Sequence, residues 1–300
     1  MIDLDELIAA GTVRENVPLG PYTTYKSGGP ARYIIEVRTL EELEALSGAG
    51  VMARPVLVLG RGSNLVVSDS GFPGLVIRLG PEFGAIEIDG TVVASGSSSP
   101  LAQVARASVN AGLAGLEFFV GIPGSVGGAV RQNAGCFGTE TRDRLIEATV
   151  LDLSDARVTK NTPDQLEMSY RHSSVTATQV VLSARFQARE GEVSVGLEEL
   201  RRIIRWRRDN QPGGTFNAGS VFKNPPGATA GEIIDSLGLK GLKVGDVAVS
   251  AKHANFFVAG PDATSSDIRR LVVAVKDRVL EETGTNLEPE IQFVGFEDEH

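Results

Sequence analysis

Several features are scarce or missing in this sequence of 300 residues, and each absence narrows its function. The single cysteine, Cys136, excludes an internal disulfide and cannot alone build a metal site. Lys and Arg total 29 against 38 Asp and Glu, and the net charge of -9 disfavours nucleic-acid binding, which needs basic surfaces. Apolar runs such as residues 55–59 are far shorter than the ~20 residues of a bilayer span. Residues 1–6 are acidic where a signal peptide is basic, so we predict a cytoplasmic protein with no nucleic-acid or membrane partner.

The sequence does contain enough apolar residues for a core, and its glycine is unusually clustered. Hydrophobic residues make up 42% of the chain. At roughly 100–200 residues per domain, the length predicts two or three units. The 35 glycines fall in groups rather than being spread evenly. No internal repeat of about 20–50 residues is visible, which disfavours solenoids and propellers.

Short strand-like and helix-like segments alternate along the chain. Strands are predicted at residues 31–37, 55–59, 65–67 and 287–293, with several more between 74 and 185. Helices are predicted after Thr39, after Ser99, and at residues 197–208 and 265–282. In the second of these helices, Ser99 is the expected N-cap and Pro100 the first helical residue. The pattern predicts an α+β fold with three lobes.

Two glycine-rich loops are candidates for binding a phosphorylated ligand. The first, GRGSN at residues 60–64, joins two predicted strands, whereas a Rossmann fingerprint requires a helix after its glycines. Its glycines allow successive N–H groups to point at one anion, although an ordinary tight connection explains this short motif equally well. The second, GIPGSVGGA at residues 121–129, carries apolar residues among its glycines, unlike a flexible linker. Together the loops could clamp a dinucleotide without a Rossmann fold.

Three polar side chains outside these loops suit proton transfer and the stabilisation of an anion. They are Arg171 in SYRHS, Ser220 in GSVFKNP and Glu290 in LEPEI. An Arg, a hydroxyl and a carboxyl group fit this chemistry if they converge. Each also has an ordinary explanation, as a surface ion-pair partner, a turn residue and a solvated carboxylate respectively. His172 and His253 have no Cys or carboxylate at a ligand spacing, so no metal site is predicted.

The motifs, in their order along the chain, resemble those of the UDP-N-acetylenolpyruvoylglucosamine reductases, the MurB family. The matching segments are NVPLG (16–20), YTTYKSGGP (22–30), GRGSNLVV (60–67), GIPGSVGGA (121–129), NAGCFG (133–138), SYRHS (169–173), GSVFKNP (219–225), residues 238–258 and LEPEIQFVG (287–295). The resemblance implies an FAD-binding unit of the vanillyl-alcohol-oxidase type formed by lobes at residues 1–73 and 74–195. An α+β lobe at residues 196–291 would bind a UDP-sugar, and residues 292–300 would pack back on the first lobe. The chain resembles the shorter type, without an extra substrate-covering insertion.

The resemblance also implies a specific reaction, that of a UDP-N-acetylmuramate dehydrogenase in peptidoglycan synthesis. Non-covalently bound FAD would take hydride from NADPH and pass it from flavin N5 to C3 of UDP-N-acetylglucosamine enolpyruvate. Ser220 matches the residue that delivers a proton to C2. Arg171 and Glu290 match the residues that polarise the substrate carboxylate, and Glu290 must be protonated to donate a hydrogen bond. A monomer is expected.

Further contacts follow from the resemblance, position by position. For FAD they are Tyr25, Gly60, Arg61, Gly62, Ser63, Asn64, Gly121, Ile122, Pro123, Gly124, Ser125, Gly128, Ala129, Asn133 and Gly135. For the substrate they are Tyr170, Gly219, Lys223, Asn224, His253 and Asn255. Ser27, Arg131 and Gln132 depart from residues common in the family near the flavin. These departures concern flavin binding and leave the reaction untouched.

Two other functions are compatible with the same motifs. A flavin oxidase acting on a sugar acid or polyol would use the same FAD fold but would transfer electrons rapidly to oxygen. A flavin- or nucleotide-binding regulator would have no turnover at all. The presence of Arg171, Ser220 and Glu290 together argues against the regulator, because a protein without turnover does not need this set.

Overall fold

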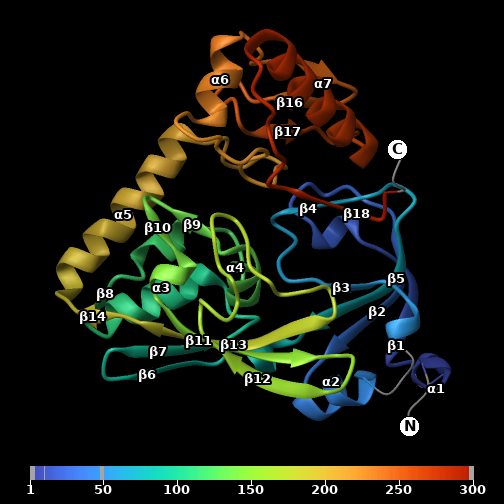
Figure 1. Cartoon of the computed structure of the whole chain (residues 1–300), viewed down its shortest axis with the longest axis vertical. Helices are drawn as coiled ribbons and strands as arrows, with labels where there is room; N and C mark the ends of the chain where they lie inside the picture. Colours follow the sequence, from blue (N-terminus) through green and yellow to red (C-terminus); the bar gives the residue numbers. More distant parts are fainter. Residues whose placement is uncertain (1–3, 10, 48–50, 297–300) are drawn as a thin grey trace. The chain divides into compact units, whose positions relative to one another are not determined.

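The computed structural model describes residues 4–9, 11–47 and 51–296 (Figure 1). Contacts within the chain divide it into two compact units. Unit 1 comprises Met1–Glu15, Tyr33–Arg61 and Pro73–Trp206, and unit 2 comprises Asn16–Arg32, Gly62–Phe72 and Arg207–His300, in each case without the residues that are not described. The three lobes expected from the sequence stay a prediction. Of the predicted returning segment 292–300, residues 297–300 lie outside the described residues.

A four-stranded sheet carries one part of the core of unit 1. Its strands are β1 (Val13–Pro18), β2 (Pro30–Val37), β5 (Phe72–Leu79) and β3 (Val56–Val58), in that spatial order, with β3 parallel to β5. The flanking helices are α1 (Leu4–Ala9) and α2 (Leu40–Ser47). Helix α2 begins as predicted, because the Glu42 N–H donates to Thr39 Oγ1 at 3.2 Å. Its Leu43 and Leu46 are buried in one apolar cluster with residues of β2 and β5.

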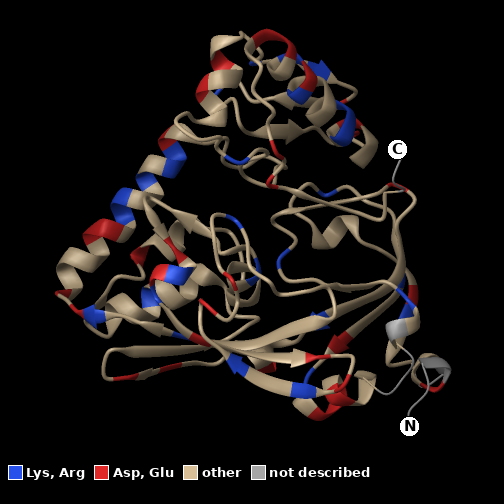
Figure 2. Cartoon of the chain, in the orientation of Figure 1, with Lys and Arg blue, Asp and Glu red and all other residues tan. Residues whose placement is uncertain are grey.

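A five-stranded antiparallel sheet with helices forms the rest of unit 1. The strands are β12 (Arg157–Asn161), β11 (Leu145–Asp152), β13 (Gln179–Gln187), β7 (Val92–Gly96) and β6 (Ile86–Asp89), in that spatial order. The helices are α3 (Leu101–Asn110), α4 (Val126–Gln132) and most of α5 (Val193–Asn210). Phe119 and Phe186 meet edge to face in the core, with ring centroids 5.2 Å apart. The arginines of α5 are mostly exposed along the helix (Figure 2).

The short elements of unit 1 connect these layers. They are the two-residue strands β8 (Leu113–Ala114), β9 (Gly135–Cys136), β10 (Thr139–Glu140) and β14 (Arg189–Glu190), and the 3-10 helices η2 (Val51–Ala53), η3 (Pro81–Gly84), η4 (Glu117–Gly121) and η5 (Thr141–Asp143). Strands β9 and β10 pair with each other, so the NAGCFG motif forms a small hairpin directly after α4.

Unit 2 has its own apolar core between two helices and short strands. Its elements are η1 (Gly20–Tyr22), β4 (Leu65–Val67), α6 (Ala230–Ser236), β15 (Lys243–Val244), β16 (Val247–Val249), β17 (Phe257–Ala259), α7 (Ser265–Thr283) and β18 (Gln292–Val294). Strands β15, β16 and β17 form one sheet, and β18 pairs in parallel with β4. Helix α7 starts with a capping box of Thr264 and Asp267 and ends at Gly284, which has a left-handed φ of 71°.

The structure corrects the predicted elements in three places. Pro100 is the N-cap of α3, and Ser99 does not cap it because its hydroxyl donates to the Gly84 carbonyl at 2.9 Å. Part of the glycine segment predicted as a loop is helix α4. The predicted strand at residues 287–293 is a strand only in β18, because the Glu290 N–H donates to the Val221 carbonyl instead of a sheet neighbour.

Candidate functional site

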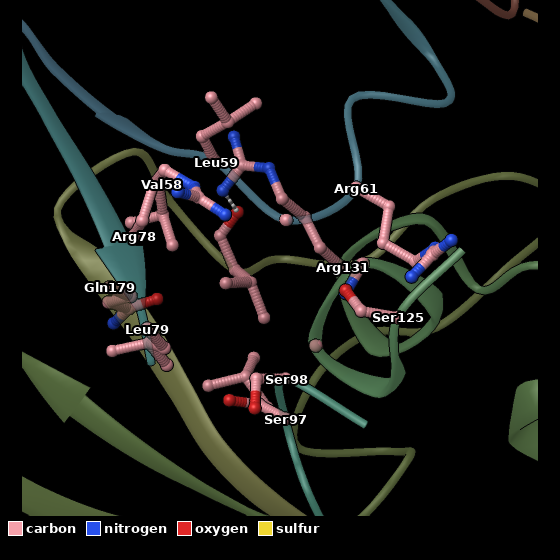
Figure 3. Close-up of a pocket in the computed structure, with 15 residues that line it drawn as sticks. Val58, Leu59, Arg61, Arg78, Leu79, Ser97, Ser98, Ser125, Arg131 and Gln179 are labelled. Carbon is pink, nitrogen blue, oxygen red and sulfur yellow. Dashed lines mark hydrogen bonds between the residues drawn. The ribbon is translucent and has the colours of Figure 1, made fainter. Parts of the chain in front are cut away.

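A cavity of about 190 Å³ lies within unit 1 where the first glycine loop meets the start of α4 (Figure 3). Its wall combines apolar side chains with serines, glycines and three arginines. The lining residues are Val58, Leu59, Gly60, Arg61, Arg78, Leu79, Ser97, Ser98, Ser125, Gly127, Gly128, Arg131, Val175, Gln179 and Val181. Such a mixture of flat apolar walls and a few polar groups is typical of a cofactor site.

Two predicted glycine loops come together at this cavity. A Cβ atom on Gly60 would lie 2.7 Å from Ser125 Oγ, so any larger residue at position 60 would force the Ser125 hydroxyl to move. Ser125 is the N-cap of α4, and its hydroxyl accepts a hydrogen bond from the Gly128 N–H at 3.4 Å. The expected proximity of residues 60–61 to residues 125–128 therefore exists in unit 1.

The first N–H groups of α4 are already occupied. The Val126 N–H donates to the Ser99 carbonyl at 3.0 Å, and the Gly127 N–H donates to the Ser97 carbonyl at 2.9 Å. Ser97 is only 4% exposed, and its hydroxyl has no hydrogen-bond partner among the described residues. Because a buried polar atom rarely goes unpaired, this hydroxyl marks where a ligand would supply the partner.

Arg131 adds a buried cation to the cavity wall. Its guanidinium donates to the carbonyls of Val175 at 3.0 Å and Thr176 at 2.6 Å. Burial lowers the pKa of this guanidinium from its usual value, yet an arginine stays charged in proteins. Arg61 adds a second cation to the wall, and the two suit a phosphorylated ligand. Arg78 also lines the cavity, but its guanidinium is paired with Glu36 at 3.1 Å. The sequence had marked Arg131 only as a departure from the family, and nothing had indicated Ser97 or Arg78.

Arg171 lies in a tight turn of unit 1. Ser169 and His172 exchange two backbone hydrogen bonds of 3.1 Å, and Arg171 between them has a φ of 55°. A non-glycine residue in this region is uncommon and is found disproportionately at functional sites. The neighbouring Tyr170 is 44% exposed and stacks on the Arg171 guanidinium at 4.9 Å.

Ser220 and Glu290 lie next to each other in unit 2. The Glu290 N–H donates to the Val221 carbonyl at 2.7 Å, so the segment after Pro289 runs beside the segment that carries Ser220. On the opposite side, Ser220 pairs with Phe256 in a β-bridge. The Asn64 side chain in turn donates to the Glu290 carbonyl at 3.0 Å. The structure thus brings together two of the three predicted catalytic residues within unit 2, and places Arg171 in unit 1.

The predicted substrate residues of unit 2 make protein contacts of their own. Asn255 is 3% exposed, accepts from the Phe222 N–H at 2.9 Å and donates to the Phe222 carbonyl at 2.8 Å. Lys223 Nζ pairs with Glu288 at 2.6 Å. Asn224 accepts from the Ala230 N–H at 3.0 Å, at the start of α6. Burial is the largest cause that lowers the pKa of His253, which keeps its imidazole neutral near pH 7.

The remaining predicted residues divide between the two units. Gly121, Ile122, Pro123, Gly124, Ala129, Asn133 and Gly135 belong to unit 1, and Tyr25, Gly62, Ser63, Asn64 and Gly219 to unit 2. Tyr25 is 1% exposed in the apolar core, and burial raises the pKa of its phenol. The Asn133 side chain is fully buried and makes its hydrogen bonds to the protein.

Comparisons with known proteins place these units in a family. Residues 31–161 match the FAD binding domain, and residues 211–294 match the family described as "UDP-N-acetylenolpyruvoylglucosamine reductase, C-terminal domain". The reductase of that name from Erythrobacter litoralis is 42% identical and aligns over 95% of this chain and 88% of its own length. That from Parvibaculum lavamentivorans is 40% identical over 96% of this chain and 93% of its own length. The crystal structure of the reductase (MurB) from Thermus caldophilus is 37% identical, with a TM-score of 0.82 over 94% of this chain and 99% of that one.

The fold and the cavity therefore define an FAD-binding oxidoreductase with a separate C-terminal domain. The chain belongs to the UDP-N-acetylenolpyruvoylglucosamine reductase family. The predicted α+β class, the family and FAD as cofactor are confirmed. The cavity also fits that cofactor, because its arginines and the unpaired Ser97 hydroxyl suit phosphate and polar ring atoms. Among the described helices none has the length and apolarity to cross a bilayer. The described residues hold no group of three His, Cys, Asp or Glu side chains suited to a metal.

We expect Gly60→Ala to weaken FAD binding about tenfold. This factor corresponds to about 1.4 kcal/mol, which is within the range for the loss of one helix N-cap hydrogen bond. The new methyl group would displace the Ser125 hydroxyl, which would then lose its bond to the Gly128 N–H. Fluorescence titration of the apoprotein with FAD measures the change. Gly213→Ala is the matched control, because nothing lies within 4 Å of its added Cβ. Equal FAD affinity in the two variants would show that the Gly60–Ser125 approach does not shape the site.

Proposed function

We propose that this chain reduces UDP-N-acetylglucosamine enolpyruvate to UDP-N-acetylmuramate with NADPH as the electron donor. FAD, when bound, would supply the hydride-transfer chemistry between NADPH and C3 of the enolpyruvyl group. The tasks left to the protein are to hold the cofactor, to stabilise the charge that develops on the substrate carboxylate and to deliver one proton to C2. The observation that carries the proposal is that the segment with Glu290 is hydrogen-bonded to Val221, the residue after Ser220, inside the part of the chain that matches the family's C-terminal domain.

Ser220 is the proposed proton donor. Its hydroxyl sits on a half-buried segment held on one side by Phe256 and on the other by the Glu290 backbone. The hydroxyl is too weak an acid to protonate water, but it is adequate towards a carbanion, and a nearby cation would stabilise the alkoxide. Lys223 is the proposed cation, and its side chain is 21% exposed.

Arg171 and Glu290 are the proposed partners of the substrate carboxylate. The guanidinium offers a rigid fork of donors that matches a carboxylate, and protonated Glu290 would donate one more hydrogen bond. Lys223, Asn224 and His253 lie in the proposed UDP-sugar lobe, where Lys223 would exchange the exposed Glu288 for a phosphate oxygen. For FAD, the proposed contacts in unit 1 are the predicted residues that line the cavity, namely Gly60, Arg61, Ser125 and Gly128.

An anaerobic absorbance experiment on the purified holoprotein tests the proposal. NADPH is added first, and UDP-N-acetylglucosamine enolpyruvate is added second. We expect NADPH to bleach the visible absorbance band of the oxidised flavin. The sugar nucleotide should then restore this band in full. A parallel sample given UDP-N-acetylglucosamine should stay bleached, because that compound lacks the enolpyruvyl acceptor.

The outcomes separate the proposal from its alternatives. A band that bleaches but returns only when air is admitted would favour an oxidase of another sugar acid or polyol. A band that NADPH does not bleach would contradict the proposed electron donor. A protein that binds FAD and shows neither half-reaction would be a regulator without turnover.

A further inference from the structure

We propose that Glu140 is the positioning residue for Arg171, and that Asn133 fixes Glu140 in turn. This inference rests on the proposed role of Arg171 at the substrate carboxylate. It concerns a relay of three side chains, all within unit 1, that the motifs of the sequence did not indicate as a group. We call it the Asn133–Glu140–Arg171 relay.

The Arg171 guanidinium is held on three sides. Its Nη1 lies 3.4 Å from Glu140 Oε1, its Nη2 donates to the Gly135 carbonyl at 3.0 Å, and its carbon lies 4.9 Å from the Tyr170 ring centroid. The side chain is only 16% exposed. These contacts fix the plane of the Arg171 guanidinium. Holding a long arginine side chain in one conformation costs rotamer entropy, which the contacts must offset.

Glu140 is itself held by a fully buried amide. Asn133 Nδ2 donates to Glu140 Oε2 at 2.9 Å and to the Ser169 carbonyl at 2.7 Å, and Asn133 Oδ1 accepts from the Arg142 N–H at 2.9 Å. Asn133 therefore ties the turn that carries Arg171 to the hairpin that carries Glu140. With 0% exposure and both ends of its amide engaged, Asn133 acts through these contacts. The sequence had suggested it as a flavin contact.

The relay requires a carboxylate at position 140. One oxygen faces the Asn133 amide and the other faces the guanidinium, so both must accept. The carboxylate also accepts from the Asp143 N–H, because Glu140 and Asp143 form the capping box at the start of η5. A glutamine offers one acceptor oxygen and one donor group, and one of its two neighbours would then face a donor. The donor towards Arg171 would be repelled by the cation, and the fork would leave its place. A preorganised donor at a developing anion is worth much more than a mobile one.

The same relay begins at the helix that borders the cavity. Asn133 is the C-cap of α4 in a left-handed conformation, with a φ of 42°, and α4 starts at Ser125 beside Gly60. Helix α4 is short and packed on β13, so its two ends are fixed relative to each other. These contacts inside unit 1 therefore fix the position of the Arg171 turn relative to the wall of the cofactor cavity.

Glu140→Gln in the holoenzyme tests the relay. We expect FAD affinity and the rate of flavin reduction by NADPH to stay within about twofold of wild type. Reoxidation by UDP-N-acetylglucosamine enolpyruvate should slow about 10²-fold, the scale of a misplaced catalytic group. Asp143→Asn is the matched control, because Asp143 accepts the Glu140 N–H at 2.8 Å in the same capping box but does not touch Arg171. The control should keep both half-reactions.

A second comparison separates positioning from a general structural role. In an Arg171→Ala background, adding Glu140→Gln should cost nothing further, because a residue that acts only through Arg171 has nothing left to position. A further loss in the double variant would overturn the relay, and so would equal effects of Glu140→Gln and Asp143→Asn. If Glu140→Gln does not fold, Glu140→Asp keeps the charge but withdraws it by one methylene, and its reoxidation rate should fall between wild type and the Arg171→Ala variant. A wild-type protein that the sugar nucleotide does not reoxidise would instead contradict the proposed function.

Discussion

Ser220→Ala is expected to leave flavin reduction by NADPH intact and to slow transfer to the enolpyruvyl sugar about 10³-fold, the middle of the range for general acid catalysis. The change removes only the hydroxyl, and the backbone that holds it is bonded through Val221 and Phe256. The fold of unit 2 should therefore persist. Single-turnover absorbance measurements under anaerobic conditions follow the two half-reactions separately.

The control for this variant is Ser236→Ala, an exposed serine at the end of α6 in the same unit. Its hydroxyl donates only to the Ile233 carbonyl, so both half-reactions should be unchanged. If Ser220→Ala slows both half-reactions equally, the serine serves the structure of the site and is not the proton donor. If it slows neither, the proton comes from elsewhere.

Gly62→Ala should lower the free energy of unfolding by about 3 kcal/mol or more. Gly62 has a φ of 60°, and a Cβ atom there would lie 2.1 Å from the Tyr22 carbonyl oxygen and 2.9 Å from Thr23 Cα. Both are backbone atoms, and the Thr24 N–H also donates to the Gly62 carbonyl at 3.1 Å, so the neighbouring chain cannot move aside alone. Since domains are stable by only about 5–15 kcal/mol, the loss is a large share of the total.

Urea denaturation followed by circular dichroism measures this loss. The comparison is with Gly213→Ala, which meets nothing within 4 Å and should change stability by less than about 1 kcal/mol. A Gly62→Ala protein as stable as this control would mean that the 22–24 segment moves aside at little cost. The close approach to the Tyr22 carbonyl would then not be what requires glycine.

Local signals in the sequence were sufficient for the long, periodic elements. Helix α7 lies within one residue of its prediction, because its apolar stripe and the terminating Gly284 are local signals. The strands between residues 74 and 185 were likewise indicated by β-branched runs between turn residues. The alternation of strand-like and helix-like segments also indicated the α+β class without any knowledge of contacts.

Elements that depend on distant partners could not be derived in this way. Four of the nine residues at 121–129 are glycine, which hid the helix α4; its first N–H groups are satisfied by carbonyls of residues 97 and 99. Ser99 had the right spacing for a cap but donates to Gly84 instead. In both cases a long-range hydrogen bond decided between two locally reasonable conformations.

The candidate site residues were identified from the order of the motifs shared with the MurB family more than from the chemistry of the individual side chains. Taken alone, Arg171, Ser220 and Glu290 were more compatible with ordinary surface or turn residues than with a site. The left-handed φ of Arg171 and the Glu290–Val221 hydrogen bond could not be read from the sequence, because each depends on the folded backbone. Glu140 carried no signal at all, since an acidic residue in a hairpin is ordinarily solvated.

The pairing of β4 with β18 has a consequence for the synthesis of this protein. Leu65–Val67 cannot form its strand pair until Gln292–Val294 has been synthesised. Unit 2 therefore cannot complete its folding until almost the whole chain has left the ribosome. Meanwhile β4 has an unpaired edge, which is the kind of surface that binds chaperones or other nascent chains. The order of translation thus makes unit 2 the last to fold, however early its first segment, Asn16–Arg32, is made.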